Sequence, residues 1–222
     1  SDEDAQGAHA RRLIPAIDHL LSSCSLTLSS LDGLAVSIGP GSFTGLRVGL
    51  ATMLGFRLSS GLPLAAVPTL EAMAWNNRDS PHCLCPVLKA RTGEVYWAVY
   101  QWVDAGRPTR ISEERVGSLE TMAQSLHVPV VMLGEGWQIY RNELRDLLGP
   151  RMQAVLEAPK EAMAASAVSV GLAGLERLAR GMVVEAGLSP LYVQRAEAEL
   201  NWDRKHAAVS AGNAGRPPGD EA

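Results

Sequence analysis

Few side chains in this 222-residue sequence have the types and spacing that catalysis or metal binding requires. Cys83 and Cys85 alternate in an apparent strand, which places both thiols on one face, but a zinc site needs about four ligands. The five histidines are scattered and form no HxxxH or HExxH motif. We therefore interpret the cysteines as buried core residues and expect no metal site and no cofactor of the chain's own.

Ser42 is the strongest candidate nucleophile by position, and its surroundings argue against that role. It lies in Gly-Ser-Phe-Thr-Gly, which is not the G-x-S-x-G nucleophile elbow, and no His–Asp pair can be assigned to it. A hydroxyl just before a helical pattern is typical of an N-cap, so Ser42 or Thr44 is expected to cap the helix that follows. We expect no catalytic residue in this chain.

The turn around Ser42 is the most informative feature of the sequence. A short apolar alternation over 34–38 runs into a turn, and a helical pattern then lasts to Gly61; the signature residues of the turn are Gly39, Pro40, Gly41, Ser42 and Gly45. A strand, a glycine turn and a helix place backbone N–H groups at a helix N-terminus, where anions are held. The spacing fits neither the Walker A motif nor the dinucleotide fingerprint. Three interpretations stay open: an anion cradle, a plain tight turn, and a packing surface.

The helix predicted over 43–60 favours the packing surface. Small residues recur at helical spacing at Gly45, Gly49, Thr52, Gly55 and Ser59, and apolar residues occupy most of the remaining surface. A helix that is apolar nearly all round must be covered on two sides. One side can face its own sheet, and the other suits a helix approaching over the glycines, such as 9–24 and its counterpart in another subunit, which indicates helix-bundle association.

The remaining polar and aromatic patterns have structural interpretations. The segment 89–94 predicts a hairpin loop, either solvated or forming a polar wall of a cleft between lobes. The aromatic stripe of the following strand predicts sheet packing more than base stacking, because little basic charge surrounds it; it comprises Tyr96, Trp97, Tyr100 and Trp102.

The elements that position these residues alternate between strands and helices, which indicates an α/β protein with two lobes. Helices are expected over 9–24, 43–60, from Thr69, over 118–126, 137–148 and 167–180, and strands over 34–38, 63–67, 84–90, 93–103, 129–133 and 152–156. Pro15 would suit a first helical turn. A polar segment at 76–81 marks the expected lobe boundary. We predict a first lobe over 1–78, a second over 79–202 and a disordered tail over 203–222.

Composition sets mild limits on the partners and the cellular setting of the protein. A net charge of −4 gives no basic field that would attract nucleic acid. Three cysteines are too few for a disulfide framework, which favours a reducing, cytoplasmic setting. No signal peptide or membrane span is apparent. The sequence begins Ser-Asp-Glu-Asp without methionine, so we expect that an N-terminal piece is missing.

Residues 36–58, with the core SIGPGSFTGLRVGLATMLGF, closely resemble the signature of the TsaB (YeaZ) family. Supporting resemblances run along about 9–197: a family-like H-x-R-R-L-x-P-x-I-D-x-L-L helix over 9–21, and further segments over 63–74, 89–96, 133–144 and 188–195. The family provides the dimerisation subunit in bacterial synthesis of threonylcarbamoyladenosine at tRNA position 37.

The resemblance implies an actin/Hsp70/sugar-kinase-like (ASKHA) fold with two RNase H-like lobes, the first incomplete here. It implies a non-catalytic scaffold that pairs with the catalytic subunit TsaD through its first two helices, with the ATPase TsaE joining and ATP or ADP held at the subunit junction. tRNA would be reached only through the complex, and a homodimer through the same helices stays open. Carried over by position, the expected interface residues are Arg11, Arg12, Leu13, Ile17, Leu20, Phe43, Thr44, Arg47, Val48, Ala51 and Met53.

Two departures accompany the resemblance. Lys89 stands where the family usually has aspartate, which changes the charge at the cleft-side hairpin. The family's first strand and hairpin, with an L-x-I-D-T-S turn, are not found, so the strands over 34–38 and 63–67 are expected to form a small sheet with an unpaired edge. The alternative function is a nucleotide-binding or metal-dependent enzyme of the same fold, kinase-like or glycoprotease-like.

Overall fold

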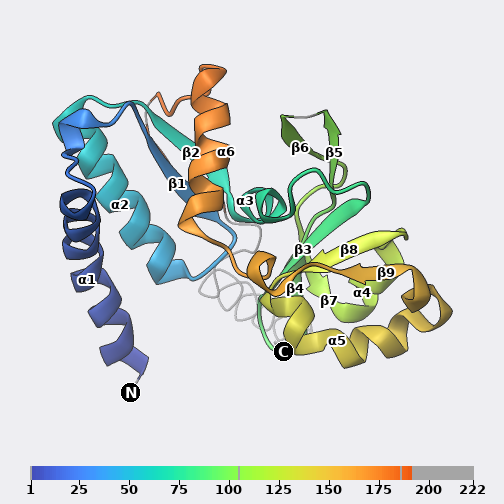
Figure 1. The fold of residues 1–222 in the computed structure, drawn as a ribbon. Helices are drawn as coiled ribbons and strands as arrows, with labels where there is room; N and C mark the ends of the chain where they lie inside the picture. Colours follow the sequence, from blue (N-terminus) through green and yellow to red (C-terminus); the bar gives the residue numbers. More distant parts are fainter. Residues whose placement is uncertain (1, 105, 186, 192–222) are drawn as a thin grey trace, which may run out of the picture. The chain divides into compact units, whose positions relative to one another are not determined.

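The glycine turn joins a parallel strand to a long helix, as predicted. In the computed structural model, which describes residues 2–104, 106–185 and 187–191 (with the side chains of 2–11 and 104 outside the description), β1 (Leu34–Gly39) leads into α2 (Phe43–Ser60) and then β2 (Leu64–Pro68). The two strands pair in parallel with Leu34 opposite Leu64. Leu34 and Val36 are buried under Leu50 of α2, so the alternation seen in the sequence is the helix-facing side of the sheet. Figure 1 shows this unit.

The larger sheet has β3 (Cys83–Lys89) at its centre. On one side β3 pairs in antiparallel fashion with β4 (Glu94–Trp97) and β5 (Tyr100–Asp104), which share a single register, so they are one strand interrupted at Ala98–Val99. The return strand is interrupted too, and β6 pairs with β5 while β7 pairs with β4. On the other side β8 is parallel to β3, and β9 to β8. The bounds are β6 (Arg107–Arg110), β7 (Arg115–Ser118), β8 (Val130–Leu133) and β9 (Val155–Glu157).

Three expectations about single elements need correction. The strand expected unbroken over 93–103 is divided by the interruption at Ala98–Val99. The strand expected over 152–156 begins only at Val155, because residues 149–154 form tight helical turns that start at Gly149 and Pro150. The helix expected over 9–24 begins at Asp2 and contains Pro15 in its interior. A proline removes one ladder hydrogen bond, and a helix of 22 residues keeps its other turns.

The helices otherwise agree with the predicted pattern, and their ends are capped as the sequence indicates. Ser118 and Ser166 accept hydrogen bonds from backbone N–H groups three residues on, and Gly61 closes α2 in the left-handed conformation. The remaining helices are α1 (Asp2–Ser23), α3 (Thr69–Ala74), α4 (Leu119–Ser125), α5 (Glu135–Leu148) and α6 (Ala167–Ala179). Short tight-helical segments lie at Leu28–Ser30, Trp75–Asn77, Gly149–Ala154 and Lys160–Ala162.

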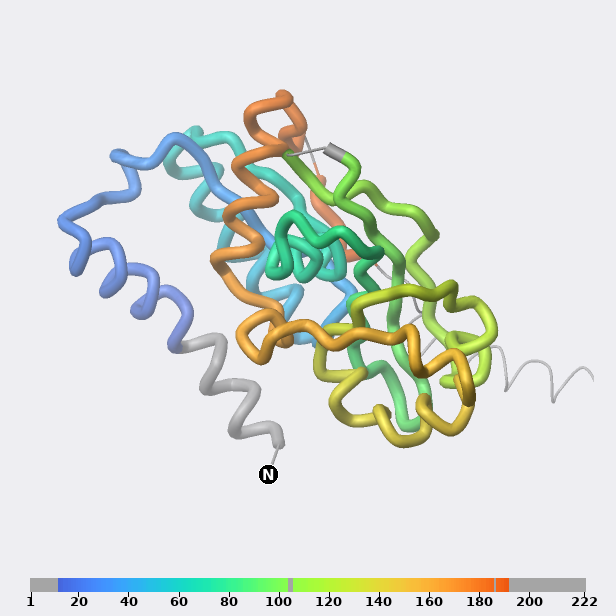
Figure 2. Tube along the Cα trace, turned by 45° about the vertical axis from the view of Figure 1, so that its right-hand side comes forward, coloured from blue at the N-terminus to red at the C-terminus, as the bar shows by residue number. Residues whose placement is uncertain are grey.

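Helices α3 and α6 join the two sheets, because each contacts strands that belong to the other part of the chain. The late helix α6 packs on the early strands β1 and β2, and α3, which follows β2, contacts both these strands and β3 of the larger sheet (Figures 1 and 2). A Cβ at Gly174 would lie 2.3 Å from the Ala35 Cβ, so α6 approaches β1 as closely as it does only because residue 174 is glycine. Ala35 alternates with Leu34 and Val36, so the small sheet lies between α2 on one face and α6 on the other.

The main core lies in the larger sheet and confirms the structural interpretation of the aromatic stripe. Trp97 and Tyr100 are at most 2% exposed, and Trp102 meets Trp75 edge to face at 5.2 Å between ring centroids. Cys85 is fully buried, and burial raises the pKa of its thiol, as expected of a core residue. The tail predicted over 203–222 lies outside the described residues, and the lobe boundary at 76–81 stays a prediction.

Candidate docking surface

The glycine turn serves to start α2. The Ser42 hydroxyl accepts a hydrogen bond from the Gly45 N–H at 3.3 Å, which confirms the N-cap prediction. Gly39 has a φ of +114°, and a Cβ there would lie 3.0 Å from the Leu191 carbonyl oxygen. Backbone conformation and close approach therefore both require glycine at this position.

Helix α2 is only partly covered in the described part of the chain. Of its 18 residues only Leu50 is buried. Phe43 is 48% exposed and Leu58 is 82% exposed, although both are large and apolar. Exposed apolar surface of this kind is typical of sites of association, so α2 is a candidate docking surface.

The small residues of α2 also face open space. Among the described residues, a Cβ at Gly49 or Gly55 would meet no atom within 4 Å, and one at Gly45 would meet only Ser42. Helix α1 is a neighbour of α2, as expected, but its described side chains do not pack over Gly49 or Gly55, so that part of the prediction is wrong. The small-residue band stays free for another helix to approach.

Helix α1 extends this surface instead of covering it. It lies beside α2, which it contacts (Figure 1). Leu13, Ile17 and Leu21, spaced by four residues, are half-buried, whereas Ile14 and Leu20 are 55% and 64% exposed. No side chain described in α1, from Arg12 on, is buried. The apolar stripe predicted for this helix thus has an inner row and an exposed outer row.

The predicted interface residues fall together on these two contacting helices. Arg12, Leu20, Phe43, Thr44, Arg47 and Ala51 are exposed, and Leu13, Ile17, Val48 and Met53 are half-buried, while the Arg11 side chain lies outside the description. The Arg47 guanidinium carbon stands 3.8 Å from the centroid of the Phe43 ring, a cation–π contact that holds both side chains on the outer face. Their role in binding a partner stays a prediction.

A cavity of about 640 Å³ lies next to the turn. Gly41 and Ser42 form one wall, and Lys89, Glu135 and Lys160 contribute the charged groups. Lys89 thus faces a cavity, as one of the two interpretations of the segment 89–94 proposed, while the Glu94 N–H closes the hairpin turn on the Arg91 carbonyl at 3.0 Å. Two cations against one carboxylate give this cavity a positive balance.

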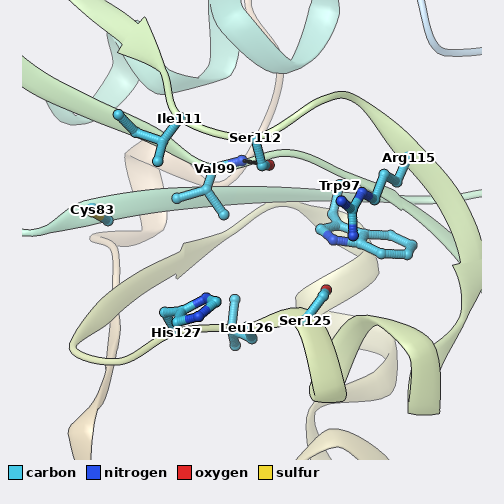
Figure 3. A pocket seen from close by; sticks show the side chains of 9 residues that line it. All are labelled: Cys83, Trp97, Val99, Ile111, Ser112, Arg115, Ser125, Leu126 and His127. Carbon is cyan, nitrogen blue, oxygen red and sulfur yellow. Dashed lines mark hydrogen bonds between the residues drawn. The ribbon is translucent and has the colours of Figure 1, made fainter.

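Two further features were not apparent from the sequence. Tyr100 donates a hydrogen bond to Glu114 at 3.1 Å, and burial raises the pKa of the Glu114 carboxyl. A hollow of about 360 Å³ opens beside Trp97, lined by residues between 83 and 127 (Figure 3). Neither could be found from local spacing, because their members come from separate segments of the chain.

Within the described residues no group of three or more His, Cys, Asp or Glu side chains could hold a metal ion. The helices of the described part include none that is long and apolar enough to cross a membrane.

The class of protein follows from the arrangement of the sheets. An antiparallel three-strand ribbon followed by two parallel strands, with a second β–α–β unit joined to it by exchanged helices, is the ASKHA fold with RNase H-like lobes. The family model described as "TsaD: tRNA N6-adenosine threonylcarbamoyltransferase" matches residues 3–202. The chain belongs to this family, and within it to the TsaB (YeaZ) proteins.

Individual relatives agree with this assignment. The chain is 29% identical to the tRNA threonylcarbamoyladenosine biosynthesis protein TsaB of Bacillus subtilis, over 87% of this chain and 83% of the relative. It is 35% identical to TsaB of Escherichia coli over 60% and 59% of the two chains. The solved structure of YeaZ from Pseudomonas aeruginosa is 28% identical and superposes with a TM-score of 0.68 over 83% of this chain and 84% of that one. The family resemblance carried by 36–58 is confirmed.

Proposed function

We propose that this chain is a non-catalytic scaffold subunit that binds a TsaD-type threonylcarbamoyltransferase in the N6-threonylcarbamoyladenosine modification of tRNA position 37. The names of the relatives, tRNA threonylcarbamoyladenosine biosynthesis proteins, support the pathway. The uncovered α1–α2 surface supports the scaffold role, because α2 buries one of its 18 residues within the chain. Apolar helical surface left in water is costly at about 25 cal/mol per Å², and association removes that cost.

The same surface would also serve a second copy of this chain. A second copy of this chain would compete for α1 and α2, so homodimer and heterodimer exclude each other. A TsaE-type ATPase would join the assembled pair, and ATP or ADP would be held at the junction of the subunits. tRNA would be bound through the complex in the cytoplasm, since a chain of net charge −4 has no basic field of its own.

Co-purification with a TsaD-type subunit tests the proposal through Val48, which is half-buried on α2. Val48→Glu would place a carboxylate in the apolar contact, and we expect the affinity to fall by at least about 100-fold. The matched control is Ile139→Glu on α5, because Ile139 is 50% exposed on a helix outside the surface. Binding by the control and its loss in the variant would support the scaffold role. No association of the unmodified chain, or equal binding by both variants, would overturn it.

One observation favours a second candidate, a nucleotide-binding protein of the same fold. Lys89 and Lys160 line the cavity of about 640 Å³ beside the N-terminus of α2, and phosphate groups favour such surroundings. Calorimetric titration of the isolated chain with ATP separates the two functions. Micromolar binding that is lost in the Lys89→Ala, Lys160→Ala double variant would favour this candidate, and an absence of binding heat would oppose it.

A further inference from the structure

The hollow beside Trp97 lies where two interruptions in the larger sheet coincide. The strand formed by β4 and β5 is broken at Ala98–Val99, and the return strand is broken between β6 and β7. Across the gap, the Ile111 N–H donates to the Val99 carbonyl at 2.7 Å and the Val99 N–H donates to the Ser112 hydroxyl at 2.9 Å. These hydrogen bonds replace regular ladder pairs at the edges of the gap. The hollow is therefore a hydrogen-bonded interruption of the sheet.

The walls of the hollow are apolar. Val99, Ile111 and Leu126 line it together with Trp97, as Figure 3 shows. Ile111 is 54% exposed, so its side chain presents apolar surface to the opening. A volume of about 360 Å³ lies within the range of small-molecule sites, which are typically lined by apolar side chains with a few polar groups.

Arg115 is the charged side chain among the nine residues that line the hollow. Arg115 and His127 line it, and none of the nine lining residues is acidic. The neighbouring carboxylates are engaged elsewhere, since Glu113 pairs with Arg110 at 3.5 Å and Glu114 accepts the Tyr100 hydroxyl. In the part of the chain that the structure describes, no carboxylate lies within ion-pair distance of the Arg115 guanidinium, which is always charged and offers paired donors to a carboxylate.

We propose that this hollow binds a small apolar carboxylate, with its hydrocarbon group against Val99, Ile111 and Leu126 and its carboxylate on Arg115. The apolar lining provides the affinity and the unpaired guanidinium selects the acid over a neutral compound of the same shape. The imidazole of His127 lines the same hollow and adds a polar group (Figure 3). The site does not involve the α1–α2 surface. A test of ligand binding at the hollow is therefore independent of the proposed scaffold role.

Phenylacetate and phenylacetamide form the test pair, because they share a shape and differ in charge. Each is titrated into the ¹⁵N-labelled chain, and amide shifts at 97–99 and 111–115 report binding at the hollow. We expect phenylacetate to bind with a dissociation constant of about 1 mM, the range for a ligand of its size, and the amide to bind at least about tenfold more weakly.

Three variants locate the interaction. Arg115→Gln should lower the affinity for the acid to that for the amide, and Arg115→Lys should keep part of the difference. Ile111→Trp should fill the hollow and abolish binding of both compounds. Val103→Trp is the matched control, because Val103 is 62% exposed on β5 and does not line the hollow; it should bind phenylacetate like the unmodified chain.

Several outcomes overturn the proposal. Equal affinity for acid and amide contradicts the role of Arg115, as does an unchanged preference in Arg115→Gln. Shifts confined to residues outside the hollow, or no shifts at about 20 mM ligand, contradict the site itself. Binding of phenylacetate that survives Ile111→Trp does the same.

Discussion

Arg177 forms two parallel hydrogen bonds with the carboxylate of Glu71, Nη2 to Oε2 at 2.6 Å and Nε to Oε1 at 3.2 Å. Arg177 lies in the last turn of α6 and Glu71 in the first turn of α3, so the pair connects the two exchanged helices. Both side chains are largely buried, at 17% and 21% exposure. A bidentate pair of this kind fixes the orientation of α6 on the early part of the chain.

Removing one partner of the Arg177–Glu71 pair should therefore lower the free energy of unfolding. In Arg177→Met the Glu71 carboxylate would stay largely buried without its partner, and we expect a loss of about 3 kcal/mol in the free energy of unfolding. The double variant Glu71→Leu, Arg177→Met should regain most of this, because it leaves no uncompensated charge. Urea denaturation followed by circular dichroism measures both. Arg180→Met, which breaks the pair between the half-exposed Arg180 and Glu176, serves as control; Glu176 keeps Arg107 at 3.9 Å, so stability should change by less than about 1 kcal/mol.

The Glu114 carboxyl predicts a pH dependence of stability. Burial raises its pKa above the ordinary value, and Oε2 has no hydrogen-bond partner among the described residues. The folded state therefore keeps the proton to higher pH than the unfolded chain, so this group makes the free energy of unfolding fall as the pH rises through the window between the two pKa values. Below the ordinary pKa of glutamate, about 4.3, the carboxyl is protonated in both states and the penalty is absent.

Glu114→Gln should remove this dependence while leaving an acceptor for the Tyr100 hydroxyl. The stability gained by the variant relative to the unmodified chain should be small near pH 4 and larger near pH 7. Chemical denaturation at both pH values measures the difference. A gain that is equal at the two pH values would mean that the ionisation of Glu114 does not differ between the folded and unfolded states.

The close approach of α6 to β1 predicts opposite effects of one substitution at two glycines. Gly174→Ala would bring a Cβ within 2.3 Å of the Ala35 Cβ, and we expect a loss of about 1 to 3 kcal/mol through overpacking. Gly171→Ala on the same helix meets nothing within 4 Å and should stabilise by about 0.5 to 1 kcal/mol through helix propensity. Thermal unfolding compares the two. Ala35→Gly combined with Gly174→Ala should recover part of the loss, and an unstable Gly171→Ala would contradict the explanation.

Local signals in the sequence predicted the β1–α2–β2 unit well. The alternation at 34–38, the Ser42 cap and the closing Gly61 all act within a few residues, so pattern and structure agree there. The exchange of α3 and α6 could not be predicted, since it depends on the contact between Gly174 and Ala35, which are far apart in sequence. The interruption at Ala98–Val99 is likewise set by its partner strand. Before residue 9 the sequence has no apolar period, so the true start of α1 was missed.

The sequence predicted only part of the docking surface, and a physical reason explains why the rest could not be predicted. Composition showed that α2 is apolar nearly all round, which correctly implied that its own sheet covers one side. What covers the other side depends on the angle between α1 and α2, and a sequence pattern carries no information on that angle. The structure leaves Gly49 and Gly55 open, which moves the expected helix partner from this chain to another molecule.

The open glycines give the sharpest test of the docking surface. A Cβ at Gly49 meets no described atom within 4 Å, so Gly49→Leu should leave the free energy of unfolding unchanged or raise it by up to about 1 kcal/mol. If a partner helix approaches closely over this band, the added leucine would hold the two backbones apart, and the affinity for a TsaD-type subunit should fall at least about tenfold. Gly171→Leu on α6 is the matched control, because Gly171 also faces open space. Calorimetry of the purified subunits measures both affinities. Equal affinities would show that the partner does not pack over the glycines of α2, even if it binds elsewhere on the α1–α2 surface.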